Sequence, residues 1–327
     1  MRSQHFSVAG KPMKVLLTGG TSLLGGAVAT LLMARGDQVT CFQRKPSQLD
    51  CAEILGDLRD REAVFRAAQG HEAIVHLGAL VAPRPSWSDA YGVNVTGTEH
   101  VIEAAKSAGR LVHVSTPSVA FENLPTAGAG TEAPRYEGGD AYARSKAIAE
   151  RLVLSTPAVP TIVIRPHLVW GPGDTQLVGR IVDRARQGRL VLPDHGRALL
   201  DTTYIDDAAA ALVAALDRTG DSTEALGRAW VVTGNDPRPL AELVAGILEA
   251  AGLSASERSL PAPLVGFIGR VVGRLWPTSE PPLTYFAARQ LSVAHWFDQR
   301  ETQRVLRWSP RVSVEEGMKR LAASFDG

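Results

Sequence analysis

The sequence predicts an α/β fold in which a doubly wound parallel sheet is joined to a smaller, interleaved C-terminal lobe. The main observation is that short aliphatic or β-branched runs alternate with helical stretches through the first half of the chain. Such alternation is typical of parallel strands joined by right-handed crossovers, with helices on both faces of the sheet. The second observation is that the alternation weakens after Gly171-Pro172-Gly173, where proline-rich breaks become frequent.

Hydrophobic periodicity and glycine breaks place each expected element. A strand at 14–18 leads into a helix at 23–35, which Gly36 ends, and a second strand covers 38–42. Later strands are expected at 52–55, 73–77, 111–114 and 161–164, with helices at 87–107 and 140–154, and residues 201–215 and 229–233 are expected to return to the sheet. We therefore expect a loose extension (1–13), a nucleotide-binding domain (14–170 plus 199–234) and a substrate lobe (171–198 plus 235–327).

The composition excludes several classes of protein. The formal net charge is +1 and no basic run occurs, which argues against a nucleic-acid partner. The eight histidines show no metal-ligand spacing, and no Gly-x-Ser-x-Gly motif or P-loop is present, so we expect no metal site, hydrolase or kinase. Cys41 and Cys51 are interpreted as small buried hydrophobic residues, as is usual in a reducing cytoplasm. No stretch approaches the ~20 apolar residues of a membrane span, and residues 1–12 lack the apolar core of a secretory signal.

A glycine-rich turn, Thr18-Gly-Gly-Thr-Ser-Leu-Leu-Gly25, joins the first strand to the first helix. Glycine is needed there because a tight turn must bring backbone N–H groups close to a pyrophosphate at the helix N-terminus. Ser22 stands where a third glycine is expected, so its Cβ would crowd the phosphates, although its hydroxyl could donate to them. The turn predicts a Rossmann-type dinucleotide site formed by Gly19, Thr21, Ser22, Leu23, Leu24 and Gly25.

The end of the second strand favours NADPH over NADH. NAD-selective proteins usually place a carboxylate here to bind the ribose 2′-OH, but this chain has Phe42-Gln43-Arg44-Lys45. The Arg44 guanidinium can bind a 2′-phosphate through two N–H groups and stack on adenine, with Lys45 beside it. The alternative is a solvated Arg-Lys pair. We therefore predict NADPH/NADP+ as cofactor and leave NADH open.

Tyr142-Ala-Arg-Ser-Lys146 lies on an expected helix, where the i, i+4 spacing places both side chains on one face. A nearby ammonium would lower the pKa of the Tyr142 phenol and make it a usable acid/base catalyst. Thr116 follows an expected strand whose carboxyl end faces the cofactor crevice, where a hydroxyl can hydrogen-bond a substrate carbonyl. The alternatives are an exposed helix pair and a hydroxyl that caps a turn.

Together these motifs resemble the extended short-chain dehydrogenase/reductases, from about Lys14 to the C-terminus. The resemblance implies that Tyr142 is the proton donor, that Thr116 supplies the catalytic hydroxyl, and that Lys146 also binds the nicotinamide ribose. Asn94 matches an Asn-Val-x-Gly-Thr pattern of the family, in a supporting role that the sequence does not define. The further cofactor residues implied are Asp57, Leu58, Leu77, Gly78, Ala79, Ser115, Pro166 and Leu168, and the substrate residues are Thr116, Ser118 and Val169.

Several stretches resemble one branch of this family, which contains 3β-hydroxysteroid dehydrogenase-like enzymes. More narrowly, they resemble bacterial reductases of 2-alkyl-3-oxoalkanoates in long-chain olefin biosynthesis. The resemblance implies reduction of the β-ketone of a lipid-like keto acid by a cytoplasmic homodimer that pairs through 87–107 and 140–154. The alternatives are a hydroxysteroid dehydrogenase, a sugar-nucleotide epimerase or dehydratase, and a non-catalytic NADP-binding protein. The stretches concerned are 115–119, 170–174, 201–206 and 308–317.

A helix expected near 263–276 carries an apolar face formed by Leu264, Ile268, Val271 and Leu275. The first interpretation is that this face packs on the core. The second is a lid over an acyl-chain pocket, with Arg270 meeting the substrate carboxylate, and the third is peripheral contact with a lipid interface.

Four other polar residues receive structural interpretations. His113 and His167 lie near expected strands and are interpreted as core or rim histidines rather than bases. The pair Asp206-Asp207 precedes a helical stretch and is interpreted as a helix cap.

Overall fold

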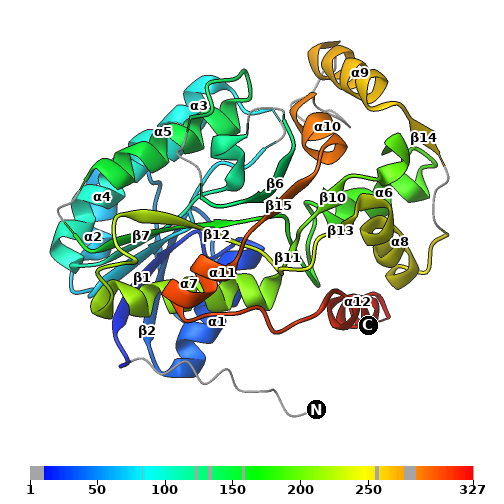
Figure 1. The fold of residues 1–327 in the computed structure, drawn as a ribbon. Helices are drawn as coiled ribbons and strands as arrows, with labels where there is room; N and C mark the ends of the chain where they lie inside the picture. Colours follow the sequence, from blue (N-terminus) through cyan, green and yellow to red (C-terminus); the bar gives the residue numbers. More distant parts are fainter. Residues whose placement is uncertain are drawn as a thin grey trace.

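A seven-stranded parallel sheet with helices on both faces forms the centre of the molecule (Figure 1). The computed structural model describes residues 11–326 except 83, 122–123, 132–134, 157–158, 255–257 and 276–284, so most of the expected extension lies outside the described residues. The strand order β12-β7-β5-β4-β1-β2-β3 reverses direction between β1 and β4, where the carboxyl ends of the strands open a crevice. The strands are β1 (Lys14–Thr18), β2 (Gln38–Gln43), β3 (Ala52–Leu55), β4 (Ala73–His76), β5 (Leu111–Val114), β7 (Thr161–Pro166) and β12 (Arg228–Val232).

Each face of the sheet has its own apolar core. Because side chains alternate along a strand, Val15 and Leu17 of β1 face one core and Leu16 faces the other. Helices α1 (Leu23–Arg35) and α7 (Ile205–Asp221) cover the first core. Helices α2 (Arg61–Ala68), α4 (Gly97–Ala108) and α5 (Ala141–Ser155) cover the second. The predicted α/β fold with a parallel sheet is confirmed.

Two of the sequence expectations for the middle of the chain are corrected. The helix expected at 87–107 is interrupted, since α3 (Trp87–Tyr91) continues into a π-helical turn at Gly92–Thr96 before α4 begins. Most of 201–215 forms helix α7, and its short strand β11 (Thr203–Tyr204) pairs with β8 (Val169–Trp170) outside the main sheet. A run of alanines suits this helix, which lies flat against the sheet.

Asp207 does not cap α7 through its side chain, contrary to the sequence interpretation. Helix α7 has no side-chain cap, and the buried Asp207 carboxylate instead accepts the backbone N–H groups of Arg311 (2.8 Å) and Val312 (3.0 Å). It therefore fixes the chain segment that leads into the C-terminal helix α12 (Val314–Phe325).

The smaller lobe is built from short strands and helices around a separate apolar core. Its four-stranded sheet has the order β13-β10-β15-β6, and the core lies among α6 (Val178–Arg186), α8 (Leu240–Ala250) and α12. The remaining short elements are β6 (Thr126–Ala129), β9 (Leu192–Pro193), β10 (Leu199–Leu200), β13 (Arg238–Pro239), β14 (Ser259–Leu260), α9 (Ala262–Leu275), α10 (Tyr285–Ser292), β15 (His295–Phe297) and α11 (Arg300–Leu306).

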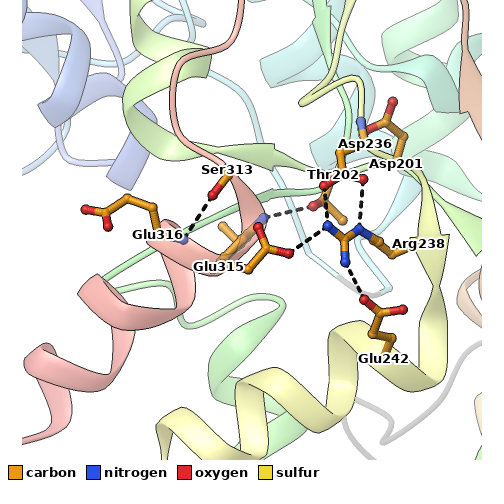
Figure 2. A network of polar contacts seen from close by, with 9 residues as sticks. Asp201, Thr202, Asp236, Arg238, Glu242, Ser313, Glu315 and Glu316 are labelled. Atoms are coloured by element: carbon orange, nitrogen blue, oxygen red, sulfur yellow. Dashed lines mark hydrogen bonds and ion pairs between the residues drawn. The ribbon is translucent and has the colours of Figure 1, made fainter.

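An arginine-centred network ties this lobe together (Figure 2). The Arg238 guanidinium contacts the carboxylates of Asp236 (2.8 Å), Glu242 on α8 and Glu315 on α12 (2.7 Å). The three carboxylates hold the pKa of Arg238 above its usual range. One side chain thus joins strand β13 to two helices that are far apart in the sequence.

The apolar face expected on the helix near 263–276 is not the buried one. In α9 the buried positions are Ala262, Val265, Gly266 and Gly269, whereas Leu264, Val271 and Leu275 are exposed. In the part of the chain that the structure describes, no helix combines the length and the apolar character needed to span a bilayer.

Candidate active site

The glycine-rich turn packs too closely for side chains at two positions. A Cβ on Gly25 would lie 2.2 Å from the Gly19 carbonyl oxygen, and Gly19 itself has φ +82°. Ser22 caps α1: its hydroxyl donates to the Gly19 carbonyl (2.8 Å) and accepts from Gly25 N–H (3.0 Å). The hydroxyl proton of Ser22 is therefore used within the turn, which explains the serine without a phosphate contact.

The same turn leaves an anion site at the start of α1. Thr21, Ser22 and Leu23 are exposed there, and no protein acceptor within the described residues takes the N–H groups of Leu23 and Leu24. Unpaired N–H groups at a helix N-terminus favour an anion such as a pyrophosphate. The geometry fits a dinucleotide.

Arg44 and Lys45 are exposed directly after β2, at the carboxyl edge of the sheet. The loop that holds them is anchored by Glu53 on β3, whose carboxylate accepts Gln43 Nε2 and Ser47 N–H, each at 2.8 Å. The anchored loop presents the two cations beside the crevice.

Asp57 lies in the same region and is already ion-paired. Its carboxylate accepts two guanidinium N–H groups of Arg59, at 2.7 and 3.0 Å. The hydrogen bonds from Arg59, with a smaller contribution from the Arg44 charge, lower the pKa of Asp57. Leu58, the next residue, is buried against Gly78, where a Cβ would lie 2.8 Å from Leu58 Cδ1.

The loop after β4 forms the floor of the crevice. Gly78 N–H donates to Thr18 Oγ1 (3.0 Å), and His76 Nδ1 contacts the same hydroxyl at 2.7 Å. These bonds fix Leu77, Gly78 and Ala79 beside the end of β1, at the point where the strand order reverses. The half-buried Leu77 and Ala79 are thus placed under the crevice.

Tyr142 and Thr116 are brought together as expected, but the pKa of the phenol shifts in the opposite direction to the prediction. Tyr142 lies in the first turn of α5 and is hydrogen-bonded to the Thr116 side chain, which caps the short helix after β5. Burial raises the pKa of Tyr142 to about 12, the Asp140 charge raises it further, and only the Thr116 bond lowers it. The phenol therefore remains protonated at neutral pH.

The Lys146 ammonium is hydrogen-bonded to the main chain at the end of β5. Its Nζ donates to the Val114 carbonyl (2.7 Å) and lies 3.5 Å from His113 Nε2. Burial lowers the pKa of Lys146 to about 8, and the Glu150 carboxylate opposes this shift. The Glu150 carboxylate also accepts a hydrogen bond from Arg165 Nε (2.9 Å), so the carboxylate that acts on Lys146 belongs to a buried ion pair. His113 is buried and its pKa is lowered by burial, as expected of a core histidine.

Asn94 has a role that the sequence did not reveal. Its amide oxygen accepts Leu80 N–H (2.6 Å), and its Nδ2 donates to the Leu80 carbonyl (3.2 Å) and to Ser145 Oγ (2.9 Å). Ser145 lies on α5 next to Lys146. The π-helical turn at 92–96 thus couples the crevice floor to the catalytic helix, and the turn itself is the structural signal of a functional position.

The remaining predicted residues lie at the end of β5, on α9 and between β7 and β8. Ser115 Oγ is buried without a hydrogen-bond partner among the described residues, at the carboxyl end of β5. The Ser118 hydroxyl accepts a hydrogen bond from Gln290 Nε2 of α10 (2.8 Å). Arg270 is exposed on α9 and stacks over the Tyr285 ring (4.7 Å) on α10, so α10 stands between it and Ser118. Pro166, Leu168 and Val169 follow one another at the carboxyl end of β7 and the start of β8.

The arrangement combines a protonated phenol, a hydroxyl beside it and a buried ammonium at the carboxyl edge of a parallel sheet. Such a set can deliver a proton to a carbonyl oxygen, which suits oxidoreduction of a ketone and alcohol. Within the described residues, no group of three or more side chains could hold a metal ion.

Comparison with known proteins agrees with this chemistry. The profile of the NAD dependent epimerase/dehydratase family matches residues 15–231. The chain is 40% identical to the 2-alkyl-3-oxoalkanoate reductase of Stenotrophomonas maltophilia, over 95% of this chain and 99% of that protein. It is 34% identical to the protein of the same name from Shewanella oneidensis, over 98% and 88%. A 3 beta-hydroxysteroid dehydrogenase/Delta 5-->4-isomerase of Mycobacterium tuberculosis is 28% identical, over 93% and 88%.

Solved structures with low identity share the fold. A UDP-glucuronic acid 4-epimerase from Bacillus cereus in complex with NAD superposes with a TM-score of 0.73 at 19% identity, covering 96% of this chain and 99% of that one. A short-chain dehydrogenase/reductase superfamily protein from Agrobacterium tumefaciens with bound NAD gives 0.74 at 22% identity, covering 95% and 96%. The chain therefore belongs to the NAD dependent epimerase/dehydratase family and is an NAD(P)-dependent oxidoreductase of the extended short-chain dehydrogenase/reductase type.

Proposed function

We propose that the protein reduces the β-ketone of 2-alkyl-3-oxoalkanoates to 2-alkyl-3-hydroxyalkanoates, as a step in the synthesis of long-chain olefins. The observation that carries the proposal is the Tyr142–Thr116 pair, in which a phenol and a second hydroxyl are hydrogen-bonded to each other beside the carboxyl end of β5 and can meet one ketone oxygen. The 40% identity to a reductase named for this substrate, along almost the whole of both chains, supports the choice of ketone.

The roles of the catalytic residues follow from their contacts. When bound, the reduced nicotinamide cofactor supplies the hydride. Thr116 and Tyr142 hydrogen-bond the ketone oxygen, and Tyr142 transfers its phenolic proton to that oxygen as negative charge develops there. Lys146, fixed by the Val114 carbonyl, would bind the nicotinamide ribose and contribute its positive charge to the same site. Ser115, whose buried hydroxyl has no partner among the described residues, would orient the same end of the cofactor.

We further propose that the cofactor is NADPH. Arg44 and Lys45 stand on a loop anchored by Glu53, at the strand end where an NAD-selective protein would carry a carboxylate. Two exposed cations there favour a ribose 2′-phosphate. The pyrophosphate would lie on residues 19–25, adenine on Asp57 and Leu58 beside Leu77, Gly78 and Ala79, and nicotinamide against Pro166 and Leu168.

The surroundings of the lobe core suit acyl chains. A cavity of about 20 Å³ lies among α6, α8, α10 and α12, and its lining is apolar apart from Thr202. Leu168 belongs both to this lining and to the proposed nicotinamide site. An acyl chain can enter this core only if side chains move, because the cavity has about the volume of one water molecule. Ser118 and Val169 would contact the substrate near the reacting carbon. Arg270, on the other side of α10 from Ser118, would reach the substrate carboxylate only if α9 and α10 moved.

We also propose a homodimer that pairs through α3, α4 and α5. Two aromatic side chains of α3, Trp87 and Tyr91, are exposed on this side and lie 5.6 Å apart, and the Arg144 guanidinium of α5 stacks over Trp87 at 4.5 Å. Exposed aromatic residues of this kind are enriched at protein interfaces. Sedimentation of Trp87→Ser beside the natural protein tests the pairing: the variant is expected to be monomeric.

The reaction is tested by following NADPH absorbance with a 2-alkyl-3-oxo acid, a 3-ketosteroid and a UDP-sugar, with product identification by mass spectrometry. We expect oxidation of one NADPH for each 2-alkyl-3-hydroxy acid formed. Epimerisation of the UDP-sugar without net NADPH oxidation would replace the proposal with an epimerase, and preferential turnover of the steroid would replace the substrate class.

A further inference from the structure

Helix α9 turns its large apolar residues outward. Leu264, Phe267, Val271 and Leu275 follow one another at spacings of three and four residues, and their exposed fractions are 43, 63, 37 and 75%. Residues at these spacings share one face of a helix and form a row roughly 16 Å long. We call these four residues the outer row.

The inner face of α9 carries small residues instead. Gly266 faces the Tyr285 ring and the Arg289 side chain of α10, where a Cβ would lie 3.6 Å from the Tyr285 ring, and Ala262 and Val265 are buried. A surface helix that only packs on a core places its large apolar residues inward. The reversed arrangement in α9 indicates that the outer row has a binding partner.

We propose that the outer row docks on an anionic lipid surface, into which Phe267 and Leu275 insert. Residues 262–275 contain two arginines and no acidic residue, and the Arg270 side chain is exposed. A narrow apolar row on a cationic helix is suited to lie at a lipid–water interface with its apolar side chains below the headgroups. The contact is peripheral, because the 14 residues of α9 are too few to cross a bilayer.

A second copy of the chain fits the outer row less well than lipid does. Antiparallel pairing of two α9 helices would bring the exposed Arg270 of each copy close to that of the other, without a carboxylate on either helix to compensate. Phospholipid headgroups supply that negative charge.

Docking at α9 would reach the catalytic loop through one further helix. Helix α9 packs on α10, and Gln290 of α10 donates to Ser118 Oγ at 2.8 Å, two residues from Thr116. A role of docking in delivering a two-chain substrate to this loop rests on the proposed function, whereas lipid binding itself does not.

The test is co-sedimentation of the full chain with vesicles of phosphatidylcholine alone and of phosphatidylcholine mixed with phosphatidylglycerol. We expect binding to the anionic vesicles, and a loss of about tenfold in the double variant Phe267→Ser/Leu275→Ser. Arg270→Gln is expected to weaken binding to anionic vesicles only, at low ionic strength. Phe325→Ser, a similarly exposed phenylalanine on α12, is the matched control and is expected to bind like the natural protein.

Melting curves and NADPH binding of the variants establish that each is folded. Equal sedimentation of the double variant and the natural protein would overturn the proposal, as would no binding to either vesicle. If the double variant instead changed the oligomeric state, the outer row would belong to an interface between copies. Because vesicle binding requires no substrate, a failed ketone assay would leave this result intact.

Discussion

The central sheet is stabilised by two apolar cores, whereas the smaller lobe also depends on ion pairs at its surface. We relate the sheet to catalysis and the lobe to substrate specificity. Strands β1, β4, β5 and β7 are buried on both faces between two apolar cores. The lobe has strands of two to four residues and relies on helices joined by Arg238 at the surface. The proposed catalytic groups stand at the end of the sheet and on α5, and the lobe contacts their loop through the hydrogen bond from Gln290 to Ser118. We propose that substrate contacts come from both parts, and we expect that changes in the lobe alter specificity more than proton transfer.

The largest expected effect is at Tyr142, at the carboxyl edge of the central sheet. Tyr142→Phe removes the proton donor and should lower kcat about 10²- to 10⁴-fold, because positioned acid/base catalysis contributes that much. NADPH binding and the melting temperature should change little, since among the described residues the hydroxyl is bonded to Thr116 alone. Stopped-flow NADPH absorbance measures the rate and fluorescence measures cofactor binding. Tyr91→Phe, on the surface of α3, is the control and should keep full activity.

The next largest effect is expected at the adenosine end of the sheet. Arg44→Asp should weaken NADPH binding by about 10- to 100-fold, the value of one or two hydrogen bonds to a charged group, and leave NADH binding unchanged or stronger. Fluorescence titration with both cofactors measures the ratio. Arg66→Asp, an exposed arginine on α2, serves as control. Equal weakening of NADPH and NADH binding would show that Arg44 is a solvated surface residue without a role in cofactor choice.

The two parts of the molecule also differed in how much could be predicted from sequence. The strands of the main sheet were located within a few residues, because they are apolar runs bounded by glycine and by helices of clear periodicity. The motifs around Gly19, Thr116 and Tyr142 are local in sequence, so their neighbours in space follow from the fold class. In the network at Arg238, the contact with Glu315 joins residues 77 positions apart, and no local pattern predicts it.

Three errors have physical causes that lie outside any local pattern. Of the three interpretations of the apolar face of α9, packing on the core was wrong, because large apolar residues occur around much of that helix and periodicity cannot tell which side meets α10. The pKa of Tyr142 was expected to fall, but Lys146 is bound to the Val114 carbonyl and burial dominates. The Ser22 hydroxyl was considered as a donor to the cofactor phosphates, whereas in the structure it donates to the Gly19 carbonyl and closes the turn.

The support behind the catalytic lysine gives a smaller, pH-dependent effect. The pKa of Lys146 is about 8, below its ordinary value of 10.5, so the ammonium is present below pH 8 and is lost as the pH rises through that value. Reduction should therefore decline above about pH 8. Since the Glu150 charge raises this pKa, Glu150→Gln should move the decline to lower pH and cost several-fold in rate at pH 8. The pH profile of kcat measures the shift.

The amide in Glu150→Gln has the shape of the carboxylate and keeps one acceptor oxygen for Arg165. A melting curve must show that the variant is folded before its pH profile of kcat is interpreted. Glu137→Gln, which is exposed, provides the control profile. An unchanged alkaline limb in a folded Glu150→Gln protein would mean that Lys146 does not govern it.

The smallest effect is expected in the lobe, at Arg238. Arg238→Met removes three carboxylate contacts from a side chain that is about one quarter exposed, so solvent screens much of their attraction. We expect a loss of about 1 kcal/mol in the free energy of unfolding, and less in high salt because ions screen the same charges. Denaturant titration at two salt concentrations measures both. Arg300→Met removes an exposed arginine–aspartate pair outside the network and should cost less. The rate of NADPH oxidation should stay near that of the natural protein, because no catalytic side chain contacts Arg238; a large fall in kcat would show that the lobe positions the catalytic groups after all.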